Sequence, residues 1–252
     1  RYYKEKIEPS FKEENPNYNK DFIQFEFDDT KRKFKDHKLF EDNDIIKIKR
    51  NSFELIVKEL EVYNLSSTSD DIKGIAFEEF LGKTFRGELG QFFTSRTIVD
   101  FMVKILDPQE NETICDPCCG SGGFLIKSFE YVKEKIEKDI IFNQKNIEKN
   151  YSNKKNLKDK LVENLQKELE ITNQKGRLHN LSYNCIYGTD ANPRMARTAK
   201  MNMIMHGDGH GGVHHNDGLL DINGIFENRF DIILTNPPFG SRVNKNQMIT
   251  DI

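Results

Sequence analysis

The residues at the end of one apolar run combine unusual chemical types. The stretch FDIILTNPPFGSR, residues 230–242, has four apolar positions that lead directly into Asn236, two prolines and Phe239. This pattern predicts a buried strand that ends at an amide side chain. The prolines stiffen the following loop and carry no backbone N–H, so the loop offers oxygen acceptors without a competing donor at those positions.

A second candidate site is the glycine-rich segment DPCCGSGG, which begins at Asp116. The alternative interpretation is an ordinary turn between a strand and a helix, without a ligand. No Lys-Ser/Thr follows the glycines, which excludes a P-loop, and the spacing G-x-G-x-x-G of a dinucleotide fingerprint is absent. Asp116 and Asp190 each end a predicted strand. Because carboxylates accept hydrogen bonds from hydroxyl groups, the two acids suit a ligand with a cationic centre and a ribose diol.

Strands and helices alternate in the part of the chain that carries both segments. In chain order the predicted elements are a helix over 98–106, a strand, turn and helix start over 112–125, a strand over 184–190, a helix over 192–207, and strands over 212–217 and 229–236. Such alternation predicts an α/β fold with a doubly wound, mainly parallel sheet and helices on both faces.

Amphipathic helices are predicted before this domain and within it. One stripe behind a capping Ser52 consists of Phe53, Ile56, Val57 and Leu60, and a second, behind Ser69, Asp70 and Asp71, of Ile72, Ile75, Ala76 and Phe80. Residues 1–50 show no usable period. The Lys, Glu and Asn-rich stretch 131–184 has leucines at four-residue spacing from Leu157 to Leu169, which predicts an inserted helical hairpin with a local packing face rather than a coiled coil.

The composition limits the possible functions. Lys and Arg total 38 against 41 Asp and Glu, a net charge of -3, so the chain lacks the global basic field of a stand-alone nucleic-acid binder. No apolar run approaches the ~20 residues of a membrane span. No signal peptide is recognised at the start, and a cytoplasmic protein is expected.

The cysteines and histidines do not predict a metal site. CDPCC contains C-x-x-C, but its cysteines lie inside the glycine-rich segment and no second pair has the spacing of structural zinc. The run HGDGHGGVHH is expected to be a glycine-rich loop between a helix and a strand. Four cysteines without a disulfide pattern favour a reducing compartment.

Five segments in order resemble one family of enzymes. GQFFTSR, CDPCCGSGGFL, YGTDANPRMARTAKMNMIMHGDG, HHNDGLL and FDIILTNPPFG are similar in order and spacing to S-adenosylmethionine-dependent N6-adenine DNA methyltransferases of the gamma arrangement, above all to the modification subunit of type I restriction-modification systems. The resemblance covers about residues 70–243. It implies S-adenosyl-L-methionine as cofactor. The implied partners are double-stranded DNA with a flipped adenine, a specificity subunit and, in larger assemblies, a restriction subunit, in a bacterial or archaeal cytoplasm.

The same resemblance implies the cofactor contacts. They are Gln91, Phe92, Phe93, Thr94, Ser95, Arg96, Asp116, Pro117, Gly120, Ser121, Gly122, Gly123, Asp190 and Asp217. Residues 91–96 are expected over the methionine end of the cofactor, Asp190 at the ribose and Asp217 at the adenine. Many members have proline where this chain has Ser95, a departure that removes no ligand group.

The resemblance also gives the asparagine loop a chemical role, with Asn236, Pro237, Pro238 and Phe239 as the catalytic residues. An adenine amine is a poor nucleophile because its lone pair is delocalised into the ring. The side-chain oxygen of Asn236 and the carbonyl of Pro237 can accept both amine hydrogens and favour a more tetrahedral nitrogen. Phe239 offers a ring on which an extruded base can stack.

Several alternatives stay open at this stage. Asn-Pro-Pro-aromatic loops also serve methyltransferases that act on RNA or on a protein glutamine. The chain could instead be a non-catalytic cofactor-binding scaffold or part of a single-chain restriction and modification enzyme. The expected organisation is a mostly helical segment over 1–88 and a methyltransferase domain over 89–252, which is expected to be incomplete because the family's sheet continues with further strands.

Overall fold

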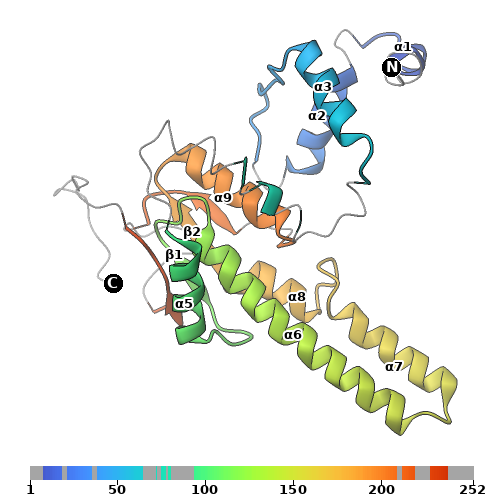
Figure 1. The fold of residues 1–252 in the computed structure, drawn as a ribbon, viewed down its shortest axis with the longest axis vertical. Helices are drawn as coiled ribbons and strands as arrows, with labels where there is room; N and C mark the ends of the chain where they lie inside the picture. Colours follow the sequence, from blue (N-terminus) through green and yellow to red (C-terminus); the bar gives the residue numbers. More distant parts are fainter. Residues whose placement is uncertain are drawn as a thin grey trace. The chain divides into compact units, whose positions relative to one another are not determined.

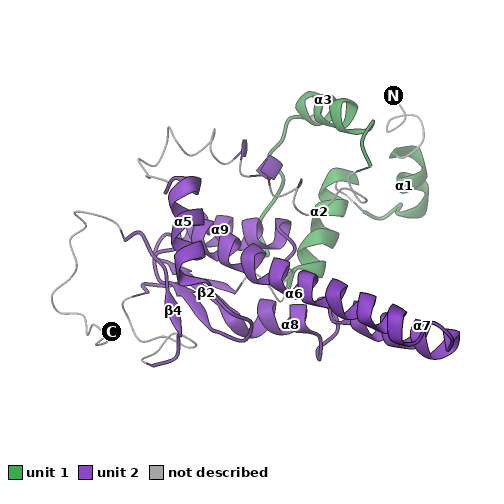
Figure 2. Ribbon diagram, turned by 60° about the horizontal axis from the view of Figure 1, so that its bottom comes forward, with its two compact units in different colours: residues 1–68 green, residues 69–252 purple. Residues whose placement is uncertain are grey.

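The computed structural model describes residues 8–18, 22–35, 39–64, 72, 75–77, 79–80, 94–208, 212–218 and 228–237. The chain divides into two compact units, residues 1–68 and residues 69–252, each of which is described by itself (Figure 2). The expected boundary near residue 88 falls outside the described residues. Within the described ranges, no helix is both long and apolar enough to cross a membrane.

The N-terminal unit contains α1 (Glu8–Glu14), α2 (Phe22–Lys33) and α3 (Arg50–Leu60). Aromatic rings join α1 to α2. The buried ring of Phe11 lies 4.9 Å from that of Phe25 and 6.0 Å from that of Tyr18, between ring centroids. These rings come from two short helices and the turn between them, so the cluster leaves no regular period in the sequence.

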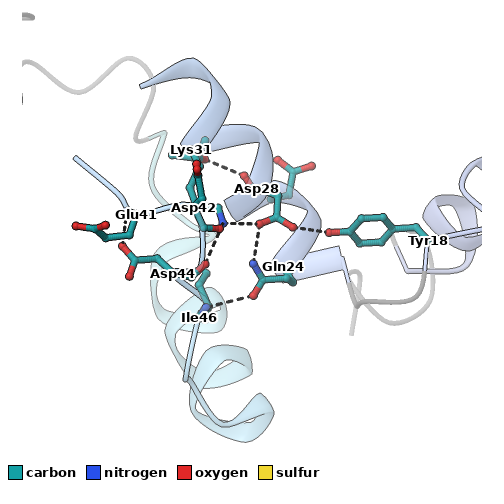
Figure 3. Close-up of polar contacts among 10 residues, drawn as sticks. Tyr18, Gln24, Asp28, Lys31, Glu41, Asp42, Asp44 and Ile46 are labelled. Carbon is teal, nitrogen blue, oxygen red and sulfur yellow. Dashed lines mark hydrogen bonds and ion pairs between the residues drawn. The ribbon is translucent and has the colours of Figure 1, made fainter. Parts of the chain in front are cut away.

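A polar network fastens the segment after α2 to that helix (Figure 3). Lys31 Nζ donates to the main-chain carbonyls of Asp42 at 2.9 Å and Asp44 at 3.0 Å. The same ammonium pairs with Asp28 at 3.0 Å, and Gln24 donates to that carboxylate at 3.0 Å. One lysine therefore satisfies two backbone acceptors and one carboxylate, which holds an otherwise irregular stretch in place.

The predicted cap of α3 is wrong. The helix begins at Arg50 with Lys49 at the N-cap position, so Ser52 lies inside the first turn and caps nothing. The stripe predicted for this helix is helical, but Ile56 is 46% and Leu60 42% exposed in the described structure. The second stripe is helical where it is described, whereas its expected capping residues 69–71 lie outside the described residues.

The second unit is built on a parallel sheet, as the alternation of strands and helices predicted. The described strands are β1 (Ile114–Asp116), β2 (Ile186–Asp190), β3 (Val213–His215) and β4 (Ile232–Ile233). Their order across the sheet is β3-β2-β1-β4, and every pairing is parallel. The predicted α/β fold is thereby confirmed, and the segment that precedes Asn236 lies directly beside the segment that ends at Asp116.

The helices of this unit are α5 (Arg96–Leu106), α6 (Gly123–Asn150), α7 (Lys155–Lys167), α8 (Arg177–Asn180), the π-helix Leu181–Cys185 and α9 (Pro193–Met205). α6 continues well beyond the sheet and pairs with α7 in a hairpin (Figure 1). The first arm of the expected insertion is thus the outer part of the helix that begins at Gly123.

One face of the sheet carries the hydrophobic core. Ile114, Ile186 and Val213 point to the same side and pack with α6, α8 and α9, where Phe129 and Met203 are fully buried. A second cluster joins α5 to α6 and to the end of β4. Among the described elements these helices all cover this one face, and the second helical layer of a doubly wound sheet is not among the described residues.

Candidate active site at the carboxyl edge of the sheet

Four polar residues predicted from sequence meet at one edge of the sheet. Asp116 and Asp190 end β1 and β2, whereas Asp217 and Asn236 follow the ends of β3 and β4. Because the strands are parallel, their carboxyl ends lie together, and ligands of open α/β sheets bind at that edge. The strand order places Asp116 in the centre, between the strands that lead to Asp190 and Asn236.

The loop from β1 to α6 has a backbone that its glycines permit. Gly120 has φ +54° and Gly122 has φ +88°, a left-handed conformation in which a side chain would be strained. Cys119 N–H donates to the carbonyl of Thr189 at 2.8 Å, and Gly120 N–H donates to Asp190 Oδ2 at 2.9 Å. The glycine-rich loop is therefore joined to the end of the neighbouring strand.

Two residues that the sequence analysis did not select hold this loop by hydrogen bonds to its main-chain carbonyls. Thr189 Oγ1 donates to the carbonyl of Pro117 at 2.8 Å, and Asn202 Nδ2 donates to the carbonyl of Ser121 at 3.0 Å. Asn202 lies within α9 and is 1% exposed. A polar residue on a buried helix position is a recognisable signal, but its partner 81 residues away was not predictable from spacing.

Asp116 lies in an environment that disfavours its charge. The residue is 1% exposed, and burial raises the pKa of its carboxyl to about 7, a rise to which the charge of Asp190 adds. The Cys118 N–H, which donates to Asp116 Oδ1 at 3.1 Å, acts against this rise. Asp116 is therefore a buried acid that a neighbouring positive charge would favour in its ionised form.

Asp190 is held by the backbone but retains acceptor capacity. Its Oδ1 accepts from Asn192 N–H at 2.8 Å and its Oδ2 from Gly120 N–H at 2.9 Å. Each carboxylate oxygen has a further lone pair, so both can still accept from a diol. Burial, followed by the charges of Asp116, Asp190 and Asp217, raises the pKa of the Cys118 thiol in the same loop.

Asn236 is joined to the segment that precedes α5. Its Nδ2 donates to Thr94 Oγ1 at 3.1 Å, across 142 residues of sequence. Thr94 is half-buried, whereas the neighbouring Ser95 and Arg96, which begin α5, are exposed. Predicted site residues Gln91, Phe92, Phe93, Pro238 and Phe239 lie outside the described residues, so their contacts stay predictions.

The residues present fit a cationic ligand with a diol. A methyl group added at Gly120 or Gly123 would meet no heavy atom within 4 Å, so the loop has open space beside it. The acids supply negative charge and hydrogen-bond acceptors in the same place. Among the described histidine, cysteine, aspartate and glutamate residues, no group of three or more is placed to hold a metal ion.

The comparison with known proteins points to one family. The family model described as N-6 DNA Methylase matches residues 68–252, which include every predicted site residue. The chain is 27% identical over 188 residues to the type I restriction enzyme EcoEI methylase subunit of Escherichia coli, and covers 31% of that protein. Over 177 residues it is 30% identical to the MjaIX methylase subunit of Methanocaldococcus jannaschii, of which it covers 23%.

A solved structure has a similar fold. It is described as the structural basis of complex assembly and conformational transition of the type I R-M system. One of its chains matches 97% of this chain with a TM-score of 0.55 and 22% identity, and 41% of that chain is covered. The present chain spans a third or less of the length of the two methylase subunits named above.

Proposed function

This chain belongs to the N-6 DNA methylase family, and on that premise we propose that the protein containing it transfers a methyl group to the N6 amine of adenine in DNA. The observation that carries the proposal is the position of Asn236. This residue follows the strand beside β1, at the same edge as Asp116 and Asp190, and its amide is held by Thr94. An amide acceptor thus lies next to a site for a cationic, diol-bearing methyl donor.

We propose S-adenosyl-L-methionine as that donor. When bound, it supplies an electrophilic methyl group on a sulfonium. Asp190 would accept the ribose hydroxyls, Asp217 would lie at the adenine side, and the loop from Asp116 to Gly123 would approach the ligand with its backbone. The buried carboxyl of Asp116 suits this assignment because a nearby sulfonium would stabilise its ionised form.

The acceptor end of the site explains the Asn-Pro-Pro sequence. Asn236 Oδ1 and the Pro237 carbonyl would accept the two hydrogens of the adenine amine, which favours the more tetrahedral nitrogen of the transition state. Neither Pro237 nor Pro238 has a backbone N–H that would compete for those acceptors. Phe239 would stack on the extruded base.

We propose further that the complete protein is the modification subunit of a type I restriction-modification system in a bacterial or archaeal cytoplasm. Two named relatives are methylase subunits of type I restriction enzymes. The net charge of -3 supports a division of labour in which a specificity subunit reads the DNA, because non-specific affinity for DNA comes from phosphate neutralisation. In this assignment residues 89–252 form the methyltransferase domain, with a helical insertion over about 131–184, behind a helical segment over 1–88.

The test is methyl transfer by the complete subunit reconstituted with its specificity subunit. Tritiated S-adenosylmethionine is incubated with duplex DNA, and the labelled nucleosides are separated. The expected product is N6-methyladenine, and Asn236→Ala should lower turnover by ~100-fold or more, the scale for loss of one preorganised transition-state partner. Label in 5-methylcytosine, in RNA or in protein would contradict the proposal, as would an Asn236→Ala variant with normal turnover.

A further inference from the structure

We infer that Thr94 is a positioning residue, which orients the Asn236 amide so that its oxygen faces the adenine amine. The inference rests on the proposed function and extends it to a residue that was predicted only as a cofactor contact. The observation is the hydrogen bond from Asn236 Nδ2 to Thr94 Oγ1, 3.1 Å long and partly buried.

An amide at this position needs a partner that selects its orientation. Rotation by 180° about the last side-chain bond exchanges the oxygen and the nitrogen with almost no change in shape. In one orientation Oδ1 is available to accept from an amine, and in the other Nδ2 presents two hydrogens to a donor. Only the first orientation is productive, so the contact that holds Nδ2 away from the substrate position decides how much of the enzyme is competent.

A hydroxyl group can make this selection when its own hydrogen is already donated. Thr94 Oγ1 can donate one hydrogen bond and accept two. If its hydrogen goes to an acceptor group of a bound ligand, only its lone pairs are left for Asn236, and the amide must present Nδ2 to it. Thr94 belongs to the segment that is expected over the methionine end of the cofactor. The carboxylate at that end of the cofactor can accept a hydrogen bond. Occupancy of the cofactor site would thereby lock the amine acceptor in its productive orientation.

The position of Thr94 supports a role through Asn236. It directly precedes the Ser95 N-cap of α5, and that helix is fixed by Val99 and Val103, which pack with Phe124 and with Leu234 at the end of β4. The same cluster that seats α5 therefore seats the strand end that carries Asn236. One hydrophobic cluster therefore holds both Thr94 and Asn236, which keeps the distance between the donor and the acceptor short.

The test uses the complete subunit with its specificity subunit and three variants. Thr94→Val removes the hydroxyl at constant shape, Thr94→Ser restores it, and Thr97→Val makes the same change at an exposed position in the first turn of α5. Turnover should fall about 3- to 10-fold in Thr94→Val, the effect of one net hydrogen bond, and stay near normal in the other two. In an Asn236→Ala background, Thr94→Val should cause no further loss, because the two residues act through one bond.

A binding readout separates this role from a cofactor contact. With S-adenosylhomocysteine in place of the methyl donor, affinity is measured for duplexes that carry adenine or purine, which lacks the amine, at the target position. The unmodified complex should prefer adenine, and Thr94→Val should lose that preference while Thr94→Ser keeps it. An active complex in which Thr94→Val retains the preference, or in which its loss adds to that of Asn236→Ala, overturns the positioning role. A complex that methylates no adenine refutes the proposed function, and this assignment with it.

Discussion

Asp116 should make the stability of the protein depend on pH in an unusual direction. Burial raises the pKa of its carboxyl from an ordinary 3.8 to about 7. The folded protein therefore holds this proton more tightly than the unfolded chain does. The contribution of Asp116 to stability is complete below about pH 4 and is lost as the pH rises to about 7. About three pH units at 1.36 kcal/mol each correspond to a loss of about 4 kcal/mol.

Asp116→Asn removes the titration at nearly constant shape, and an asparagine oxygen can still accept from the Cys118 N–H. Measured with urea and far-UV circular dichroism, the free energy of unfolding of the variant should rise relative to that of the unmodified protein by about 4 kcal/mol between about pH 4 and 7. The difference should then level off. Taking differences between variant and parent cancels the titration of all other groups, which isolates this one carboxyl.

The control is an aspartate whose pKa is shifted in the opposite direction. Lys135, followed by Tyr131, holds the pKa of the exposed Asp107 below its ordinary value. Asp107→Asn should therefore be less stable than the parent at neutral pH, with a difference that closes as the pH falls below about 4. The reasoning would be refuted if the difference in stability between Asp116→Asn and the parent did not change with pH, or if the Asp116 carboxyl carbon of the parent titrated near pH 4 by NMR.

Three further predictions concern packing, ion pairing and the cofactor site. A methyl group at Gly188 would overlap Leu125 Cδ1, so Gly188→Ala should lower the free energy of unfolding by about 1–3 kcal/mol in urea. Gly123→Ala, whose methyl group meets open space, should not show this overpacking. Arg177 pairs with two carboxylates, and its side chain is 28% exposed. Arg177→Met should therefore lower the free energy of unfolding by about 1–3 kcal/mol. An unchanged midpoint of urea unfolding would show that these ion pairs contribute nothing to stability. Asp190→Ala should weaken S-adenosylmethionine binding by about 1.5–3 kcal/mol in calorimetry of the complete subunit, and unchanged affinity would remove Asp190 from the site.

The sequence by itself determined that the segments predicted to carry chemistry meet at one edge of the sheet. Apolar runs that end at Asp116, Asp190 and Asn236 predict strands, and helices between them predict parallel pairing, so the carboxyl ends had to lie together. Local rules were sufficient here because each motif contains its own turn chemistry. Glycines accept left-handed backbone and Pro193 begins a helix, and neither effect depends on distant partners. Residues 1–50 had no such local period, so the bounds of their helices were not predicted, although the segment over 1–88 was expected to be mostly helical.

Only the tertiary structure decided which distant residues touch and how far each is buried. The place of β4 beside β1 brings Asn236 within 3.1 Å of Thr94, and no spacing rule relates residues 142 positions apart. The raised pKa of Asp116 depends on the removal of water by several elements at once, so it could not be assigned from the sequence. The same holds for Thr189 and Asn202, whose roles behind the loop arise from hydrogen bonds across the fold. The periodicity of a sequence predicts on which face of a helix or strand a residue lies. Its contacts and its loss of water depend on which other parts of the chain pack against that face.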